Sequence, residues 1–164
     1  MLFRSYGTLD AFTVQAFDGT DYSSSASQIT VEVAPVNDSP VLGLLNHIAA
    51  VEDTPLAITH DALAAAASGH VTDVDTPDST STDFGYQITF VNSGKLEHKV
   101  GTAWVDITSS VTAQAPVTIT SATIDEYRWT PDANVNGTGN DALEALTINA
   151  IDADGGSSGT AFLM

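Results

Sequence analysis

The stretch Thr13-Val-Gln-Ala-Phe-Asp18 recurs later in the chain as Thr147-Ile-Asn-Ala-Ile-Asp152, with every residue number 134 higher. Apolar and polar residues alternate through both copies, and a period of two places the apolar side chains on one face of a β-strand. Each copy then runs into serines, Ser23 in the first and Ser157 in the second. The sequence therefore predicts one strand and its following turn twice.

The same alternation marks further short segments, separated by turn clusters rich in Asn, Asp and Gly. They lie at 29–33, 86–90, 117–119 and 127–129. Many short strands with regular turn signals predict an all-β sandwich of the Greek-key immunoglobulin or cadherin type. One short helix is expected, with Asp61 as its N-cap, Ala67 at its end and Gly69 as the stop.

The repeat also divides the chain. Residues 1–36 are predicted to be the tail strands of one repeat, 37–40 the linker, and 41–164 the next repeat without most of its last strand. A sandwich that lacks its last strand exposes an unpaired edge. We therefore expect residues 8–36 to supply a strand to residues 41–164, either within one chain or by exchange in a homodimer.

The composition excludes several classes of protein. The net charge is −17, with 16 Asp and 5 Glu against only four Lys and Arg, so no basic footprint for nucleic acid exists. No apolar run approaches the ~18 residues that membrane insertion needs. Cysteine is absent, which excludes disulfides and Cys-based zinc sites. The excess of Asp over Glu is typical of turns and of oxygen-coordinated Ca²⁺ sites.

Five motifs follow one another along the chain. They are Val36-Asn-Asp-Ser-Pro-Val-Leu42, Glu52-Asp-Thr-Pro-Leu56, Asp73-Val-Asp75, Trp129-Thr-Pro-Asp-Ala-Asn-Val-Asn-Gly137 and Asp152-Ala-Asp-Gly-Gly156. Together they resemble the cadherin-like tandem repeats of very large bacterial surface adhesins. The resemblance implies a secreted, cell-surface β-sandwich with Ca²⁺ at the joints between repeats. The family's linker motif carries an acidic residue where this chain has Pro35, which implies fewer ligands and weaker binding.

The acidic residues suggest a metal site built from separate loops, since no single loop has EF-hand spacing. In an immunoglobulin-like sandwich the start of the first strand, the B–C loop and the F–G loop share one end. Six residues are expected to gather there around Ca²⁺: Asn37, Asp38, Asp73, Asp75, Asp152 and Asp154. The alternative is that these residues serve turns alone, because Asp and Asn favour turns for backbone reasons.

The first functional expectation is a structural or adhesive extracellular module, stiffened by Ca²⁺ and contacting neighbouring repeats and an unidentified cell-surface or glycan ligand. The alternative is a carbohydrate-binding module, for which Trp104 and Trp129 are the candidate platforms, although core or sheet-face positions are favoured for both. No enzyme activity is expected. The stretch Gly155-Gly-Ser-Ser-Gly159 matches G-x-S-x-G, but a nucleophile elbow needs a following helix and a strand is predicted there.

Overall fold

The computed structural model describes residues 7–34, 36–75, 79–135 and 144–163. The chain forms two compact units, unit 1 (Met1–Asn37) and unit 2 (Asp38–Met164). Each unit is described by itself.

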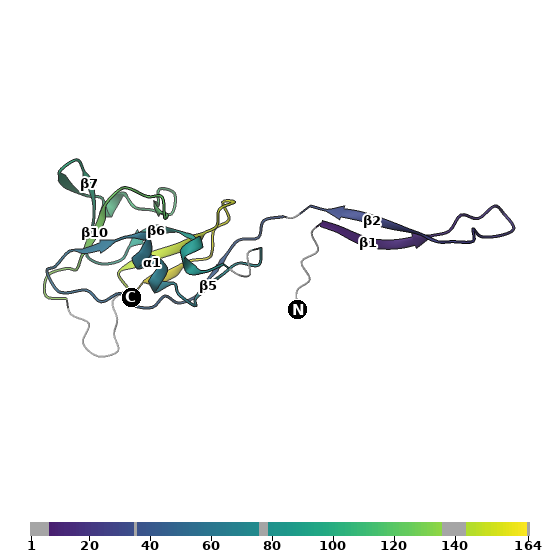
Figure 1. Ribbon diagram of the computed structural model, residues 1–164. Coiled ribbons are helices and arrows are strands. Elements are labelled where there is room, and N and C mark those ends of the chain that lie inside the picture. The colour runs from purple at the N-terminus through teal and green to yellow at the C-terminus, as the bar shows by residue number, and fades with distance from the viewer. Residues whose placement is uncertain (1–6, 35, 76–78, 136–143, 164) are drawn as a thin grey trace. The chain divides into compact units, whose positions relative to one another are not determined.

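Unit 1 is a single antiparallel hairpin of strands β1 (Gly7–Val14) and β2 (Ser27–Val33), drawn in purple and blue in Figure 1. A β-bulge between Asp10 and Phe12 shifts the register by one residue. Because of this bulge, Leu9 and Phe12 lie on the same face although they are three residues apart. The hairpin therefore keeps one continuous apolar face along its length.

The described residues of unit 2 form ten short strands, one α-helix and two 3₁₀ turns. The helix is α1 (His60–Ala66), and the 3₁₀ turns are η1 (Ser81–Asp83) and η2 (Thr108–Ser110). The strands are β3 (Val41–Leu42), β4 (Leu56–Ile58), β5 (Val71–Thr72), β6 (Gly85–Val91), β7 (Lys95–Val100), β8 (Ala103–Asp106), β9 (Val117–Ile119), β10 (Tyr127–Thr130), β11 (Leu146–Ile151) and β12 (Ala161–Leu163).

These strands form two four-stranded sheets and one two-stranded sheet. The orders are β4-β10-β7-β8 and β12-β11-β6-β9, with β3 paired to β5, and every pairing is antiparallel. Mostly β structure in several antiparallel sheets agrees with the predicted all-β class and is consistent with a sandwich.

The core of unit 2 draws on both large sheets and on the helix. From one sheet come Ile58, Leu96 and Trp129, and from the other come Tyr86, Ile88, Ile119, Leu146, Ile148 and Ala150, all buried. Helix α1 adds Leu63 and small alanines. Alternate residues of a strand share one face, so the alternation read in the sequence follows burial at Tyr86 and Ile88 and along β11. It fails at Phe90, which is 55% exposed, beyond a register shift in the pairing of β6 with β11.

The predicted cap of the helix is wrong by two residues. Thr59, not Asp61, is the N-cap: its backbone is extended and its Oγ1 accepts a hydrogen bond from the Ala62 amide at 3.2 Å. A residue capping a helix needs this extended backbone, whereas Asp61 already lies in the first helical turn. Gly69 follows the helix with φ of +77°, a conformation that favours glycine, as expected of the stop.

The two copies of the repeated sequence form hairpins of identical register. Phe12 pairs with Ile29 in β1–β2, and Leu146 pairs with Leu163 in β11–β12, each number being 134 higher in the second pair. The second turn is one residue longer than the first: the Ala16 amide donates to Ser23 Oγ at 3.1 Å, whereas the Ala150 amide donates to Ser158 Oγ, not to Ser157, at 2.8 Å. The sequence repeat is therefore a structural repeat.

The two hairpins differ in how far their apolar side chains are buried. Phe12 and Val14 are 58% and 42% exposed, whereas their counterparts Leu146 and Ile148 are 1% and 0% exposed. Strand β11 lies between β12 and β6 and faces the core of unit 2. The hairpin of unit 1 has apolar residues at the equivalent positions, but it forms a two-stranded sheet of its own.

Candidate functional site

Three of the six predicted calcium ligands lie together at the start of unit 2. Strand β3 pairs antiparallel with β5, with Val41 opposite Thr72, so the residues before β3 lie beside the residues after β5. The Asp38 amide donates a hydrogen bond to Asp75 Oδ2 at 2.6 Å, and the Asp75 amide donates to Asp73 Oδ1 at 2.7 Å. The predicted meeting of the linker with the Asp73–Asp75 motif is therefore found.

The carboxylates of Asp73 and Asp75 accept backbone hydrogen bonds and are also possible metal ligands. Each accepts a backbone N–H group. Asp73 thereby fixes the backbone that follows β5, and Asp75 holds the backbone at Asp38 beside it. They are also hard oxygen donors of the kind that Ca²⁺ prefers. The donor set fits calcium in kind, and Asp73 is buried, which restricts the positions its carboxylate takes.

Asp152 and Asp154 lie in the turn between β11 and β12. Asp152 Oδ1 accepts hydrogen bonds from the amides of Asp154 and Gly156, at 2.9 and 2.8 Å. In unit 1, Asp18 does the same for Thr20 and Asp21, and the amides of Asp21 and Thr20 hold the pKa of Asp18 below its ordinary value. The repeated aspartate thus closes the turn of each hairpin, a role that the sequence left open as the alternative.

The structure does not bring all six predicted residues into one cluster. Asn37 ends unit 1, whereas the other five residues belong to unit 2. Among the residues that the structure describes, no three acidic or histidine side chains come close enough together to hold a metal ion. Asp38, Asp73 and Asp75 are the part of the set that hydrogen bonds join.

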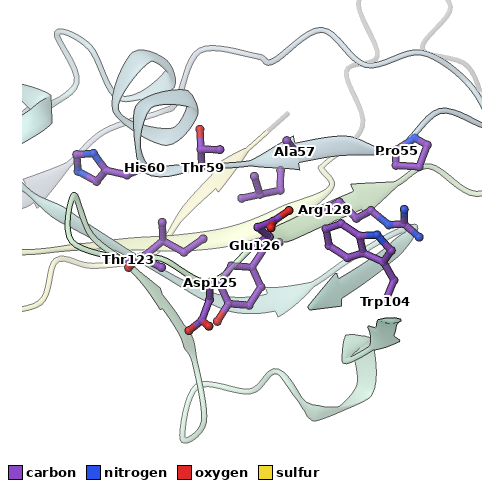
Figure 2. Close-up of a pocket in the computed structure, with 12 residues that line it drawn as sticks. Pro55, Ala57, Thr59, His60, Trp104, Thr123, Asp125, Glu126 and Arg128 are labelled. Carbon is purple, nitrogen blue, oxygen red and sulfur yellow. The ribbon is translucent and has the colours of Figure 1, made fainter. Parts of the chain in front are cut away.

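A second candidate site is a cavity of about 420 Å³ lined by residues of β4, β8 and β10 and of the segment before β10. Figure 2 shows Trp104 and Arg128 on one side of this cavity and Asp125 and Thr123 on another. We call it the Trp104 cavity. Its lining combines two aromatic rings, Trp104 and Tyr127, with the carboxylates of Asp125 and Glu126.

Ion pairs hold the charged side chains near this cavity. Arg128 Nε lies 2.7 Å from Glu97 Oε2, and its guanidinium lies 4.2 Å from the centre of the Trp104 ring. Lys99 Nζ lies 2.6 Å from Glu126 Oε1. Arg128, followed by Lys95 at 2.9 Å, holds the pKa of Glu97 below its ordinary value. Three of the chain's four basic residues therefore lie on β7 and β10.

The two tryptophans have different environments. Trp129 is buried in the core, and its Nε1 donates to the Ser93 carbonyl at 2.7 Å, so the expectation of a core position is confirmed for it. Trp104 is half-buried on β8 and borders the cavity. The sequence did not indicate the cavity, because its walls come from three segments far apart in the chain.

The G-x-S-x-G match has no nucleophile elbow. Ser157 forms an isolated bridge to Ile151, and strand β12 begins at Ala161. An elbow places its serine between a strand and a helix. The strand predicted after this motif is therefore confirmed.

No protein-family model, curated protein or solved structure matches this chain. Helix α1 is far too short to cross a bilayer, and no other described helix is long and apolar enough to do so.

Proposed function

We propose that this chain is part of a tandem array of Greek-key, cadherin-like β-sandwich repeats that serves a structural or adhesive role outside the cell, with no catalytic step. One observation carries the proposal: a hairpin occurs twice with its strand pairs at an offset of 134 residues, and in both copies a serine Oγ accepts the amide of the equivalent alanine, although the second turn is one residue longer. Its second copy is part of the core of a sandwich-like unit. Repeats in an array reuse one supersecondary unit in this way.

The array proposal makes the linker at Asn37 and Asp38 a joint between repeats. Without a cross-link, a short linker leaves neighbouring domains free to move relative to one another. The hydrogen bond from the Asp38 amide to Asp75 holds the first residue of unit 2 beside the segment that follows β5. A cation shared by the acidic residues at the joint would restrict this motion further.

We propose that Ca²⁺ binds at this joint, held by Asp38, Asp73 and Asp75 with further oxygens from Asn37, Asp152 and Asp154. The bound ion would supply positive charge that cancels repulsion among the carboxylates. The hydrogen-bonded trio of Asp38, Asp73 and Asp75 is the structural support for this proposal. Extracellular modules of this kind bind with Kd of about 10⁻⁴–10⁻³ M.

The test is a thermal melt of this chain with EDTA and with about 5 mM free Ca²⁺. At that affinity, binding to the folded state alone adds about 1–2 kcal/mol, or a rise in Tm of about 3–10 °C. The variant Asp75→Asn keeps an oxygen for the Asp38 amide and removes the charge, so it should lose the calcium-dependent rise and keep its melt in EDTA.

Asp61→Asn is the matched control, because Asp61 is 98% exposed on α1 and makes only a weak contact with His60. Its calcium-dependent rise should equal that of the wild type. A melt that is identical in Ca²⁺ and EDTA contradicts the calcium proposal, and so does a rise that survives in Asp75→Asn. Mg²⁺ at the same concentration separates specific binding from charge screening, since Mg²⁺ screens equally but demands a smaller, octahedral site.

A second candidate function is carbohydrate binding at the Trp104 cavity. Half-buried Trp104 borders a cavity of about 420 Å³ whose other walls carry carboxylates, and pyranose rings are bound by aromatic faces and planar hydrogen-bonding groups. A glycan array followed by titration of any hit should show binding that Trp104→Ala abolishes. Phe90→Ala, at an aromatic that is exposed on β6 and is not part of the cavity lining, is the control and should bind normally.

A further inference from the structure

Asp154 and Gly155 form an exposed dipeptide in the turn between β11 and β12. The only other aspartate that glycine follows in the sequence is Asp18, which precedes Gly19 in the turn between β1 and β2. In such a dipeptide the glycine nitrogen can attack the aspartate side chain easily, because glycine has no Cβ to obstruct the approach. The chain therefore has two candidate sites for this reaction, one in the turn of each repeated hairpin.

The two aspartates differ in what their carboxylates bind. Asp18 Oδ1 accepts hydrogen bonds from the amides of Thr20 and Asp21, both at 2.9 Å. In the turn of unit 2 the corresponding acceptor is Asp152, which alanine follows in the chain. Asp154 donates its amide to Asp152, and its own carboxylate accepts no hydrogen bond from the described residues. Glycine thus follows the hydrogen-bonded carboxylate in unit 1 and the free carboxylate in unit 2.

The attacking nitrogen in unit 2 is also accessible. The Gly155 amide donates no hydrogen bond to the described part of the chain, and a Cβ added at Gly155 would meet no atom within 4 Å. The side chain of Asp154 can therefore turn toward this nitrogen without breaking a contact. The side chain of Asp18 must first give up its two amide hydrogen bonds, and the amides of Asp21 and Thr20 hold the pKa of Asp18 below its ordinary value.

We propose that Asp154 is a site of spontaneous isoaspartate formation, and that its amide hydrogen bonds protect Asp18 from the same reaction. The Gly155 nitrogen forms a bond to Cγ of Asp154, and the amide proton leaves with the carboxyl OH as water. The product is a five-membered succinimide ring. Water then adds to one ring carbonyl and breaks its C–N bond; opening at the main-chain carbonyl leaves the chain linked through the side-chain carboxyl. One water is lost and one is gained, so the reaction needs no other reactant.

Isoaspartate changes the turn because it adds one methylene to the main chain and turns the main-chain carbonyl of Asp154 into a carboxylate. Asp152 Oδ1 accepts the amides of Asp154 and Gly156, which lie on either side of the lengthened link. The added methylene therefore lies inside the loop that these two hydrogen bonds close. Asp154 is also one of the proposed calcium ligands, and only this consequence, the displacement of a ligand carboxylate, rests on the proposed function.

The test incubates the whole folded chain in EDTA at mildly acidic pH, in water enriched in ¹⁸O, and follows both aspartates by peptide mapping. Each passage through the ring incorporates one labelled oxygen, whether it ends as aspartate or as isoaspartate. Asp154 should react at least about threefold faster than Asp18, the factor in rate that the loss of one hydrogen bond typically gives. No reaction at Asp154, or equal rates at the two aspartates, overturns the proposal. Because EDTA is present, this result is independent of whether calcium binds.

Two controls separate the structure from the local sequence. Ala153→Gly places a glycine after Asp152, whose Oδ1 is hydrogen-bonded as that of Asp18 is, so Asp152 should stay slow while Asp154 reacts in the same molecule. Asp152 reacting as fast as Asp154 in this variant overturns the protective role of the hydrogen bonds. In urea, where the turns are lost, Asp18 and Asp154 should react at similar rates. A difference that persists unchanged in the unfolded chain also overturns the proposal.

Discussion

Ile148 and Val14 occupy the same place in the two repeated hairpins, and the same kind of truncation should have very different consequences at each. Ile148 is 0% exposed and pairs with Ile88 of β6 in the core of unit 2. Truncating a buried isoleucine to alanine costs about 2–5 kcal/mol, made up of lost transfer free energy and a cavity. Val14 is 42% exposed, belongs to unit 1 and is not a member of the core of unit 2.

The assay uses the position of the tryptophans. Trp104 and Trp129 both lie in unit 2, so fluorescence during urea unfolding reports that unit alone. Ile148→Ala should lower its free energy of unfolding by about 3 kcal/mol, equivalent to a fall in Tm of roughly 10 °C. Val14→Ala should change it by less than about 0.5 kcal/mol, as surface substitutions do.

A graded variant and a low protein concentration complete the design. Ile148→Val removes one methylene and should cost about 0.5–1.5 kcal/mol. Measurement at a few micromolar keeps the unfolding transition free of concentration-dependent association. Equal shifts for Ile148→Ala and Val14→Ala, or a cost below about 1 kcal/mol for Ile148→Ala, would refute the difference in burial between the two hairpins.

Three other predictions concern unit 2. Gly94→Ala should lower the free energy of unfolding by more than about 2 kcal/mol in a urea titration, because φ is +72° and a Cβ would lie 2.4 Å from the Thr130 carbonyl oxygen. Arg128 is the main cause of the lowered pKa of Glu97, so this carboxylate should contribute stability that is present above the ordinary pKa of glutamate and is lost as pH falls through the lowered pKa of Glu97. Glu97→Gln should therefore make the urea midpoint depend less on pH between pH 3 and 7. An unchanged dependence of the midpoint on pH argues against the ion pair. Burial raises the pKa of Tyr86 to about 12, so the neutral phenol stabilises the fold below pH 10 and this stability is lost as pH rises toward 12; Tyr86→Phe should remove one late transition from an absorbance titration at 295 nm.

The strands that the sequence predicted are those whose apolar residues alternate without interruption. Segments 29–33, 86–90 and 117–119 all lie within strands of the structure. Strands β7 and β8 were not predicted. Strand β7 carries Lys95, Glu97 and Lys99 at alternate positions, and Lys and Glu are depleted in strands. Arg128 and Glu126, from or next to β10, compensate the charges of Glu97 and Lys99. Pairing of distant charges is not visible in a local pattern.

The candidate sites were likewise predictable from the sequence only in part. The contact between Asp38 and Asp75 was predictable, because sandwich topology brings the start of the first strand to the B–C loop. The role of Asp152 was open from sequence, since an aspartate that accepts two turn amides and one that awaits a cation have the same local pattern. The Trp104 cavity depends on the order of β4, β10, β7 and β8, which sequence spacing does not reveal.

Both lysines of the chain, Lys95 and Lys99, are on β7, in the sheet that carries Trp104. Amine-reactive reagents therefore have two side-chain targets, and both are close to Trp104 or to the Glu97 ion pair. A sensor surface coupled through these lysines would hold the molecule by this sheet and turn the Trp104 cavity toward the matrix. Glycan-binding measurements should tether the chain through a terminal tag, so that immobilisation does not mask the surface under test.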